Sequence, residues 1–322
     1  MINEMNKTIN ILFLGASKRT SLLEDFYKSA QKLNIKINVF SCEKDRDFCA
    51  ISHLATILYG PKFSDDSFQN WLDETIKKYN INIVIPNMDS ATVALSKFKE
   101  NYKNLENCWY VVSSYDLCKK MNNKQLSEKF FNNNNIPTYK NTDNVFPKIL
   151  KDKLGFGGKG QFIVNNEEEY RELLKKIDIK NYIIQDYIKG RETSTDFYVS
   201  PKNGLIGYVL RDRLEVSDGE VMNCITRYPE DKEKQLIENI AKINGWEGCI
   251  TLQYIKDKDG NIRVVEINPR FGGGATCAIA CGLDMPTYIL SEFTGLDFAI
   301  GKIKNLKMVR SRRDFFMEIK EG

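Results

Sequence analysis

A glycine-rich loop at residues 155–160 has the composition of a polyphosphate-binding segment. Its glycines leave the backbone free to approach phosphates and to direct N–H groups at them, and Lys159 adds a mobile cation. A P-loop would require Ser or Thr after the lysine, whereas Gly160 follows it here. Because the loop joins two expected strands and does not open a helix, we expect a β-hairpin that closes over phosphates. The alternative is an ordinary glycine-rich hairpin tip.

Three side chains with oxygen atoms that can bind a metal, Gln253, Glu266 and Asn268, are expected on one face of a hairpin. An Asp-Gly pair at 259–260 predicts the turn of that hairpin. If the register is unbroken, Gln253 faces Val264 and lies diagonal to Glu266, and a one-residue bulge would break this inference. Oxygen ligands with a single carboxylate suit Mg²⁺. The alternative is a solvent-exposed strand face.

Four motifs that follow one another in this order resemble those of the ATP-grasp enzymes. They are Lys151, the loop 155–160, the segment 185–192 (Gln-Asp-Tyr-Ile-Lys-Gly-Arg-Glu) and the segment 266–271 (Glu-Ile-Asn-Pro-Arg-Phe). Within that superfamily the carbamoyl-phosphate-synthetase-like branch is most similar, because a Gln precedes its E-x-N-P-R motif. The resemblance runs from about Tyr115 to Asp297, and the region before it looks like the family's pre-ATP-grasp domain.

The resemblance implies a site for ATP. The residues that would bind the nucleotide are Lys124, Lys151, Gly157, Gly158, Lys159, Gln185, Tyr187, Ile188 and Glu192. In the family pattern the lysines and glycines bind the phosphates, and Lys151 binds the α-phosphate. Gln185 would meet the adenine edge, the backbone of Tyr187 and Ile188 would bind the ring, and Glu192 would accept the ribose hydroxyls.

The same resemblance gives the metal ligands and one catalytic residue. Gln253, Glu266 and Asn268 would hold one or two Mg²⁺ ions, with Mn²⁺ as a substitute. Arg270 would stabilise the transferring phosphoryl group. Transfer of a phosphoryl group from ATP to a carboxylate substrate needs no protein nucleophile.

Two arginines of an expected strand, Arg211 and Arg213, share one face and would clamp a substrate carboxylate or acyl phosphate, so we add them to the catalytic candidates. The alternative is paired charges on a solvated strand face. Arg227 has a similar but weaker claim as a substrate contact.

Further substrate contacts are expected at the carboxyl ends of parallel strands in the N-terminal region. Ser17 and Arg19 follow the first strand, and Asp89 follows the strand at 81–86. Ligands of open α/β sheets usually bind at these ends. The alternative for these side chains is helix capping.

The elements that position these residues follow from hydrophobic periodicity. Strand and helix patterns alternate over the first hundred-odd residues, which predicts βαβ units and a parallel sheet. Residues 146–188 contain strand, glycine loop, strand, helix and strand, and strands dominate afterwards. The expected fold is α/β and α+β: a parallel-sheet pre-ATP-grasp domain (1–114), a small, mobile lid subdomain (115–188) and a large catalytic subdomain (189–322).

Composition excludes several other classes. With 42% hydrophobic and 28% charged residues the chain is typical of a folded soluble protein, and no apolar run is long enough to span a membrane. A net charge of +4 is too small to indicate nucleic-acid binding. The single histidine, His53, leaves no Ser-His or Cys-His pair, and the eight cysteines contain no CxxC motif. We expect a reduced, cytoplasmic protein without a signal peptide.

The predicted reaction is the ATP-dependent joining of a small carboxylate to an amine through an acyl phosphate, with release of ADP and phosphate. The expected partners are those two small molecules, while dimerisation is left open. The alternatives are a small-molecule kinase and an ATP-binding sensor without turnover.

Overall fold

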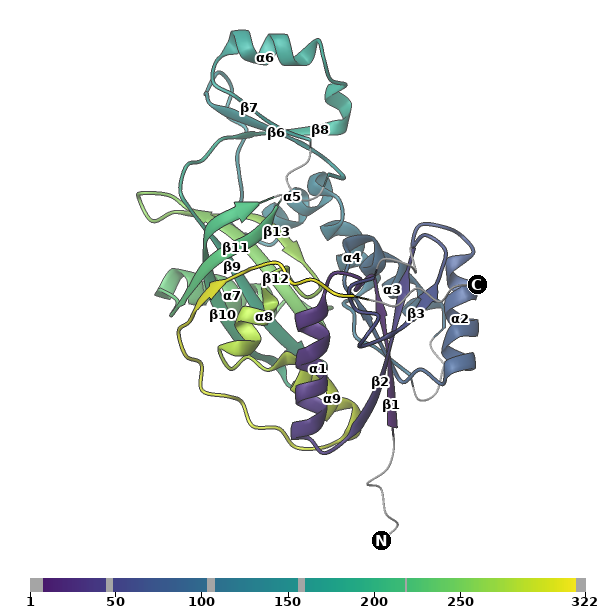
Figure 1. The fold of residues 1–322 in the computed structure, drawn as a ribbon. Coiled ribbons are helices and arrows are strands. Elements are labelled where there is room, and N and C mark those ends of the chain that lie inside the picture. Colours follow the sequence, from purple (N-terminus) through teal and green to yellow (C-terminus); the bar gives the residue numbers. More distant parts are fainter. Residues whose placement is uncertain (1–7, 45–48, 103–107, 156–159, 218, 317–322) are drawn as a thin grey trace.

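The computed structural model describes residues 8–44, 49–102, 108–155, 160–217 and 219–316. Three β-sheets organise this part of the chain, and Figure 1 shows a parallel sheet on one side, a large antiparallel sheet on the other and a small sheet above them. None of the helices in these ranges is both long and apolar enough to cross a membrane.

The N-terminal sheet has five parallel strands in the order β3-β2-β1-β4-β5. Its strands are β1 (Thr8–Leu14), β2 (Lys36–Glu43), β3 (Thr56–Tyr59), β4 (Ile83–Pro86) and β5 (Trp109–Tyr110). Its helices are α1 (Thr20–Lys32), α2 (Phe68–Tyr79) and α3 (Asp89–Asn101). The predicted parallel sheet is confirmed. The strand order reverses between β1 and β4, and open sheets bind ligands at the carboxyl ends of such a pair.

Helix α1 joins the N-terminal sheet to the rest of the molecule. Its apolar residues Leu22, Leu23 and Phe26 are buried, and the helix lies against α8 (Ala275–Ala280) and α9 (Met285–Thr294). Figure 1 shows α1 between the two large sheets. One hydrophobic core therefore runs from β1 and α1 into α8 and α9.

Three short α-helices, a 3₁₀-helix and a three-stranded sheet form the middle of the described chain. They are α4 (Tyr115–Met121), α5 (Lys124–Asn133), β6 (Lys148–Asp152), β7 (Gln161–Val164), α6 (Glu167–Leu174), the 3₁₀-helix η1 (Ile179–Asn181) and β8 (Tyr182–Asp186). Helix α4 ends before Asn122, and Asn123 caps α5 by accepting bonds from the N–H groups of Gln125 and Leu126. Asn166 caps α6 in the same way, because it accepts a bond of 2.9 Å from the Glu169 N–H.

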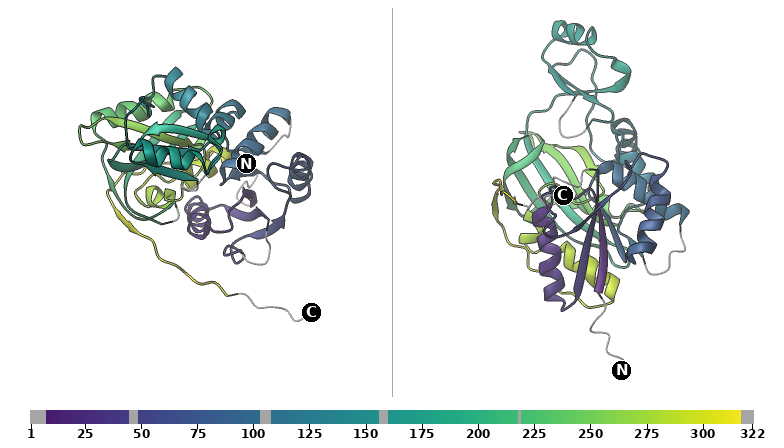
Figure 2. Two further views of the ribbon diagram at one scale, coloured as in Figure 1. Left: turned by 90° about the horizontal axis from the view of Figure 1, so that it is seen from above. Right: turned by 45° about the vertical axis from the view of Figure 1, so that its right-hand side comes forward.

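The three-stranded sheet projects away from the body, as Figure 2 shows. Its strand order is β7-β6-β8, and α6 on its outer side has no buried residue. We call residues 148–186 the lid. The domain boundaries near residues 114 and 188 stay predictions.

The large sheet has six antiparallel strands in the order β13-β12-β9-β10-β11-β14. They are β9 (Arg191–Ser200), β10 (Gly204–Ser217), β11 (Glu220–Arg227), β12 (Gly248–Lys256), β13 (Ile262–Asn268) and β14 (Lys307–Val309). Helix α7 (Asp231–Ala241) packs with α4 and α5 on one face of this sheet. Helices α1, α8 and α9 cover part of the other face.

The hairpin of β12 and β13 contains a bulge that corrects the predicted register. Tyr254 pairs with Val264, but the next pair is Gln253 with Glu266, so Val265 is the extra residue. Gln253 therefore lies directly opposite Glu266 and does not face Val264. The two side chains are direct cross-strand neighbours instead of diagonal ones.

Candidate functional site

The candidate metal ligands lie together on the β12–β13 hairpin, on the side away from its turn. Asn268 donates a hydrogen bond of 2.8 Å to Glu266 through its amide nitrogen. Gln253, opposite Glu266, accepts a bond of 3.1 Å from Arg213 Nη1 on β10. In the described part of the chain no group of three His, Cys, Asp or Glu side chains could hold a metal ion. A cation at this hairpin would therefore depend on one carboxylate and two amide oxygens, as the sequence predicts.

Arg213 also reaches the edge of the site. Its Nη1 atom lies 3.2 Å from Glu192, and its Nη2 atom donates to the Gly219 carbonyl at 3.2 Å. The Glu192 side chain is about half exposed, at 49%. Arg213 thus links Glu192, the expected ribose ligand, to Gln253.

Two lysines face this hairpin from the other side. Lys151, on the lid strand β6, is buried, and its Nζ lies 4.4 Å from the centre of the Tyr139 ring. Burial lowers the pKa of Lys151 to about 8, although the Glu266 carboxylate opposes the shift. Lys124 begins α5 and donates a hydrogen bond to the Gly155 carbonyl. Burial lowers its pKa as well, again against the attraction of Glu266.

Lys124 and Lys151 are two cations that share an attraction to one carboxylate. Burial lowers the pKa of each ammonium group, and Glu266 opposes that shift in both. A phosphate chain beside the two lysines would add negative charge, which favours their protonated form and would raise both pKa values. The predicted loop residues Gly157, Gly158 and Lys159 lie outside the described residues, so their position relative to these lysines stays a prediction.

Gln185 of β8 lies between the lid strand β6 and Glu128 of α5. Gln185 is 4% exposed, on the same face of the lid sheet as Lys151, and its Oε1 atom has no hydrogen-bond partner among the described residues. Glu128, one turn after Lys124 on α5, accepts a bond from Gln185, while burial raises its pKa. The sequence reasoning missed Glu128, although its spacing from Lys124 puts both on one helix face.

Tyr187 and Ile188 follow the last lid strand. The Tyr187 side chain is exposed, and its N–H donates a bond of 2.9 Å to the Pro147 carbonyl. Because that N–H is already bonded, the backbone groups left for the predicted contact with an adenine ring are the Tyr187 carbonyl and those of Ile188, which is half-buried.

Arg270 follows β13 and forms an ion pair with Asp89. Its Nε atom lies 2.8 Å from Asp89 Oδ1, and its Nη2 atom lies 3.2 Å from Oδ2. Burial alone would lower the pKa of Arg270, but Asp89 more than offsets it and the pKa is raised. Asp89 was predicted to contact substrate, and the structure places it on the catalytic candidate instead.

Arg211 does not lie where the sequence placed it. It is 1% exposed and donates a bond of 2.7 Å from Nε to Asp196, which also accepts a bond of 2.7 Å from Thr251. A methyl group at Gly274 would collide with the Arg211 guanidinium, so the loop after β13 closes over it. Arg211 is thus paired with Asp196 and packed against the loop that follows β13, and the expected clamp on a substrate stays a prediction.

Arg227 is also placed differently from the prediction. It lies on the opposite face of the sheet, where it donates bonds of 2.9 Å to Asp212 and 2.6 Å to Glu233 of α7. Tyr254 donates a further bond of 2.8 Å to Glu233. This network fixes α7 to the sheet and engages the Arg227 guanidinium, and a substrate contact by Arg227 stays a prediction.

Ser17 and Arg19 stand at the carboxyl end of β1, as predicted. The Ser17 hydroxyl and N–H donate to Glu43, which also accepts a bond of 2.6 Å from the Ala16 N–H. Arg19 is the N-cap residue of α1 but makes no side-chain cap bond, so the capping alternative does not hold for it. Its Nη1 atom instead donates to the Gly272 carbonyl at 3.0 Å.

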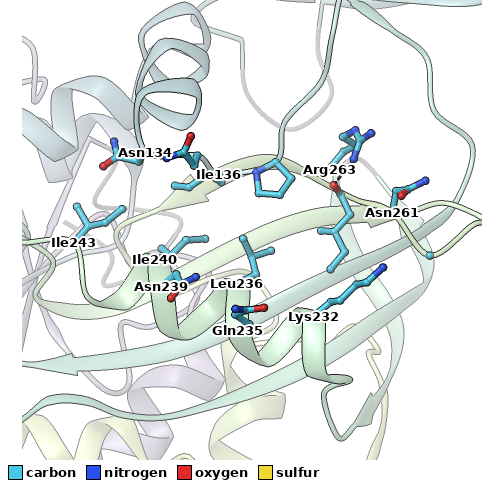
Figure 3. A pocket seen from close by; sticks show the side chains of 14 residues that line it. Asn134, Ile136, Lys232, Gln235, Leu236, Asn239, Ile240, Ile243, Asn261 and Arg263 are labelled. Atoms are coloured by element: carbon cyan, nitrogen blue, oxygen red, sulfur yellow. Dashed lines mark hydrogen bonds between the residues drawn. The ribbon is translucent and has the colours of Figure 1, made fainter.

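A separate hollow of about 640 Å³ lies on the α7 face of the large sheet. Figure 3 shows its lining, which comes from the end of α5, from α7 and from the turn before β13. Its lining residues are Asn134, Asn135, Ile136, Pro137, Lys232, Gln235, Leu236, Asn239, Ile240, Ile243, Gly260, Asn261, Ile262 and Arg263. None of them is a predicted site residue.

Comparison with known proteins identifies the middle of the chain. Residues 121–274 match the family model of the ATP-grasp domain. The arginine-specific large chain of carbamoyl phosphate synthase from Geobacillus stearothermophilus is 28% identical over 133 residues, which are 39% of this chain and 13% of that protein. N5-carboxyaminoimidazole ribonucleotide synthase from Staphylococcus epidermidis is 21% identical over 261 residues, which are 76% of this chain and 66% of that protein. The chain thus spans a small part of the first relative and just under two thirds of the second.

Solved structures share the whole architecture. N5-carboxyaminoimidazole synthetase from Staphylococcus aureus complexed with ADP has a TM-score of 0.72 at 19% identity, covering 94% of this chain and 82% of that one. L-amino acid ligase from Bacillus licheniformis has a TM-score of 0.69 at 15% identity, covering 94% of this chain and 79% of that one. At such identities the likeness shows the fold alone, and it confirms the fold predicted from the sequence.

Proposed function

We propose that this chain, whose residues 121–274 form an ATP-grasp domain, is an ADP-forming ligase that joins a small carboxylate to an amine. One observation carries the proposal: Lys151 of the lid strand β6 and Lys124 of α5 both lie near enough to Glu266 of the β12–β13 hairpin for its carboxylate to oppose the lowering of their pKa values by burial. A carboxylate suited to a cation and two lysines suited to phosphates therefore face one space. That arrangement fits a nucleotide triphosphate with its metal.

The proposal assigns a task to the candidate site residues that the structure describes. Lys124 and Lys151 bind phosphate oxygens, and Gln185 with the Tyr187 carbonyl recognises the adenine. Gln253, Glu266 and Asn268 would hold Mg²⁺, which supplies positive charge to the phosphate oxygens. Arg213 fixes the orientation of Gln253 by its 3.1 Å bond.

The chemistry then proceeds in two steps without a protein nucleophile. A carboxylate oxygen of the substrate attacks the γ-phosphorus, the bond to the bridging oxygen breaks, and ADP leaves. Arg270 stabilises the negative charge on the transferred group. The amine next attacks the carbonyl carbon of the acyl phosphate, phosphate leaves with the bonding electrons, and the amine loses a proton as the amide forms.

The proposal is tested by measuring ADP release from the full chain with ATP, Mg²⁺ and a matrix of small carboxylates and amines. We expect ADP and phosphate to form only when both substrates are present. Positional isotope exchange in ATP that needs the carboxylate alone would reveal the acyl phosphate. A stable phosphorylated product without an amine requirement would identify a kinase, and nucleotide binding without turnover would identify a sensor.

Variants test whether the proposed site residues are needed for activity. Glu266→Gln and Lys151→Met should each lower kcat/KM by about a hundredfold or more because they remove charges that face the phosphates. Lys176→Met provides a matched control, since this lysine is exposed on the lid. Full activity in either site variant would show that the site has been misplaced.

A further inference from the structure

Three arginines from separate segments of the chain bind three consecutive carbonyl groups of the loop after β13. Arg270 Nη1 donates to the Phe271 carbonyl at 3.3 Å, and Arg19 Nη1 donates to the Gly272 carbonyl at 3.0 Å. Arg310, just after β14, donates to the Gly273 carbonyl. The loop therefore brings the guanidinium groups of Arg19 and Arg310 beside that of Arg270, the catalytic candidate.

The charges in this cluster do not balance. Arg270 is paired with Asp89, and Arg310 lies 3.1 Å from Glu220, which is largely exposed. Arg19 forms no ion pair with the residues that the structure describes, and it donates hydrogen bonds to the Phe271 and Gly272 carbonyls. Burial and the neighbouring charges of Arg270 and Arg310 lower the pKa of Arg19 to about 10. The cluster thus has a surplus of positive charge.

The backbone adds to that surplus. Arg19 is the N-cap residue of α1, and no side chain caps the first turn of this helix. The positive end of the α1 helix dipole therefore lies beside the arginine cluster. The position is also the carboxyl edge of β1 next to β4, where the strand order of the sheet reverses.

The C-terminal segment holds Arg310 over this edge. Arg313 lies 2.8 Å from Glu24 of α1, and the rings of His53 and Phe315 stack with centres 4.8 Å apart. Figure 1 shows the segment passing from β14 across the end of α1 toward the N-terminal sheet. Arg310 is therefore fixed in the cluster by contacts on both sides.

We propose that Arg19 and Arg310, which the carbonyl groups of the loop 271–273 hold in place, form a subsite for an anionic group of the substrate, a carboxylate or phosphate other than the carboxylate that is activated. The inference rests on the proposed ligase function, because Arg270 belongs to both sites. It defines the substrate class: one of the two molecules to be joined carries an additional negative group. Guanidinium groups bind carboxylate and phosphate oxygens with paired hydrogen bonds, which fits this role.

Equilibrium binding tests the subsite separately from turnover. The full chain is first saturated with a non-hydrolysable ATP analogue and Mg²⁺, so that the nucleotide site is filled. Inorganic phosphate or succinate is then titrated by calorimetry. We expect one of the two anions to bind, and its identity distinguishes phosphate from carboxylate. Arg19→Gln and Arg310→Gln should each weaken that binding by about tenfold or more.

Arg312→Gln is the matched control, because Arg312 is exposed in the same segment and loses the same charge. Equal binding by all variants, or no binding of either anion to the wild type, would overturn the subsite. Failure of the ATP analogue to bind would count against the proposed function instead. Thermal unfolding of each variant shows whether it is folded.

Turnover gives a second readout. In the substrate matrix, pairs that differ only by a carboxylate or phosphate group are compared by kcat/KM. The wild type should prefer the charged member, and Arg19→Gln should lose that preference while the KM for ATP stays within about twofold. A wild type that prefers the neutral member would refute the inference even though the ligase function stands.

Discussion

Arg270 and Asp89 form a two-point ion pair between the end of β13 and the start of α3, although 181 residues separate them. The pair connects the large sheet to the carboxyl edge of the N-terminal sheet. It holds the guanidinium that we assign to the transferring phosphoryl group. The N-terminal region thus contributes to the catalytic centre that we propose.

Asp89→Asn should leave the chain folded and lower kcat by about tenfold to a hundredfold, because Arg270 loses the charge that orients it. The KM for ATP should change little, since Asp89 has no place in the nucleotide site. Steady-state ADP release for wild type and variant measures both constants. The control is Asp66→Asn, which makes the same change at an exposed residue. An unchanged kcat would show that the ion pair has no part in catalysis.

Nucleotide affinity should fall as the pH rises above about 8, the pKa of Lys151. Below that pH the ammonium is charged and attracts phosphate. Above it the lysine must take up a proton when the nucleotide binds, so affinity falls by at most about tenfold per pH unit. The dissociation constant of an ATP analogue with Mg²⁺, measured from pH 6.5 to about 9.5, checks this slope.

Lys151→Arg is the informative comparison for that pH profile, because an arginine stays charged throughout the range. The variant should show a flatter profile. A slope identical to that of the wild type would assign the titration to another group.

Gly274→Ala should destabilise the protein by about 1–3 kcal/mol, because the added methyl group meets the buried Arg211 guanidinium. Gly273→Ala is the control, since no atom lies within 4 Å of a methyl group at that position. Urea unfolding of the two variants measures the difference. Equal stability of the two variants would mean that Arg211 can move away at no cost.

Glu233→Gln should destabilise the chain by about 2–3 kcal/mol at neutral pH without affecting kcat, because it disrupts a buried network on the face away from the site. Although burial opposes the shift, Arg227 and its neighbours lower the pKa of Glu233 from 4.5 to about 2. A carboxylate with a lowered pKa stabilises the fold above its unfolded pKa and loses this effect as pH falls toward the folded value.

The stability difference between wild type and Glu233→Gln should therefore shrink as the pH falls from 4.5 toward about 2. Urea unfolding at pH 7 and at about pH 3.5 measures it. Glu238→Gln on the same helix provides a control, because the Glu238 side chain is 39% exposed. A difference that grows with acid would contradict the network.

Sequence periodicity predicted the parallel sheet, the lid strands and the β12–β13 hairpin because these elements have regular apolar patterns. It did not predict the bulge at Val265, since one extra residue leaves no compositional mark. Motif order located Lys151, Glu266 and Arg270 because each motif has a fixed spacing within one segment.

Long-range partners were beyond sequence reasoning. Arg211 and Arg227 look alike as strand arginines, but strand pairing puts them on opposite faces with Asp196 and Glu233 as partners. The contact of Arg310 with Gly273 is of the same kind, because only the folded chain brings β14 to the edge of β11. Asp89 likewise acquires its role through a contact that no local pattern encodes.

The hydrophobic core shared by α1, α8 and α9 makes the two large sheets one cooperative body. We expect the two sheets to unfold in a single thermal transition. A molecule that binds either at the proposed nucleotide site or at the β1–β4 edge should raise the temperature of that transition. Metabolite libraries can accordingly be screened by thermal shift, with one fluorescence curve that reports on both binding positions.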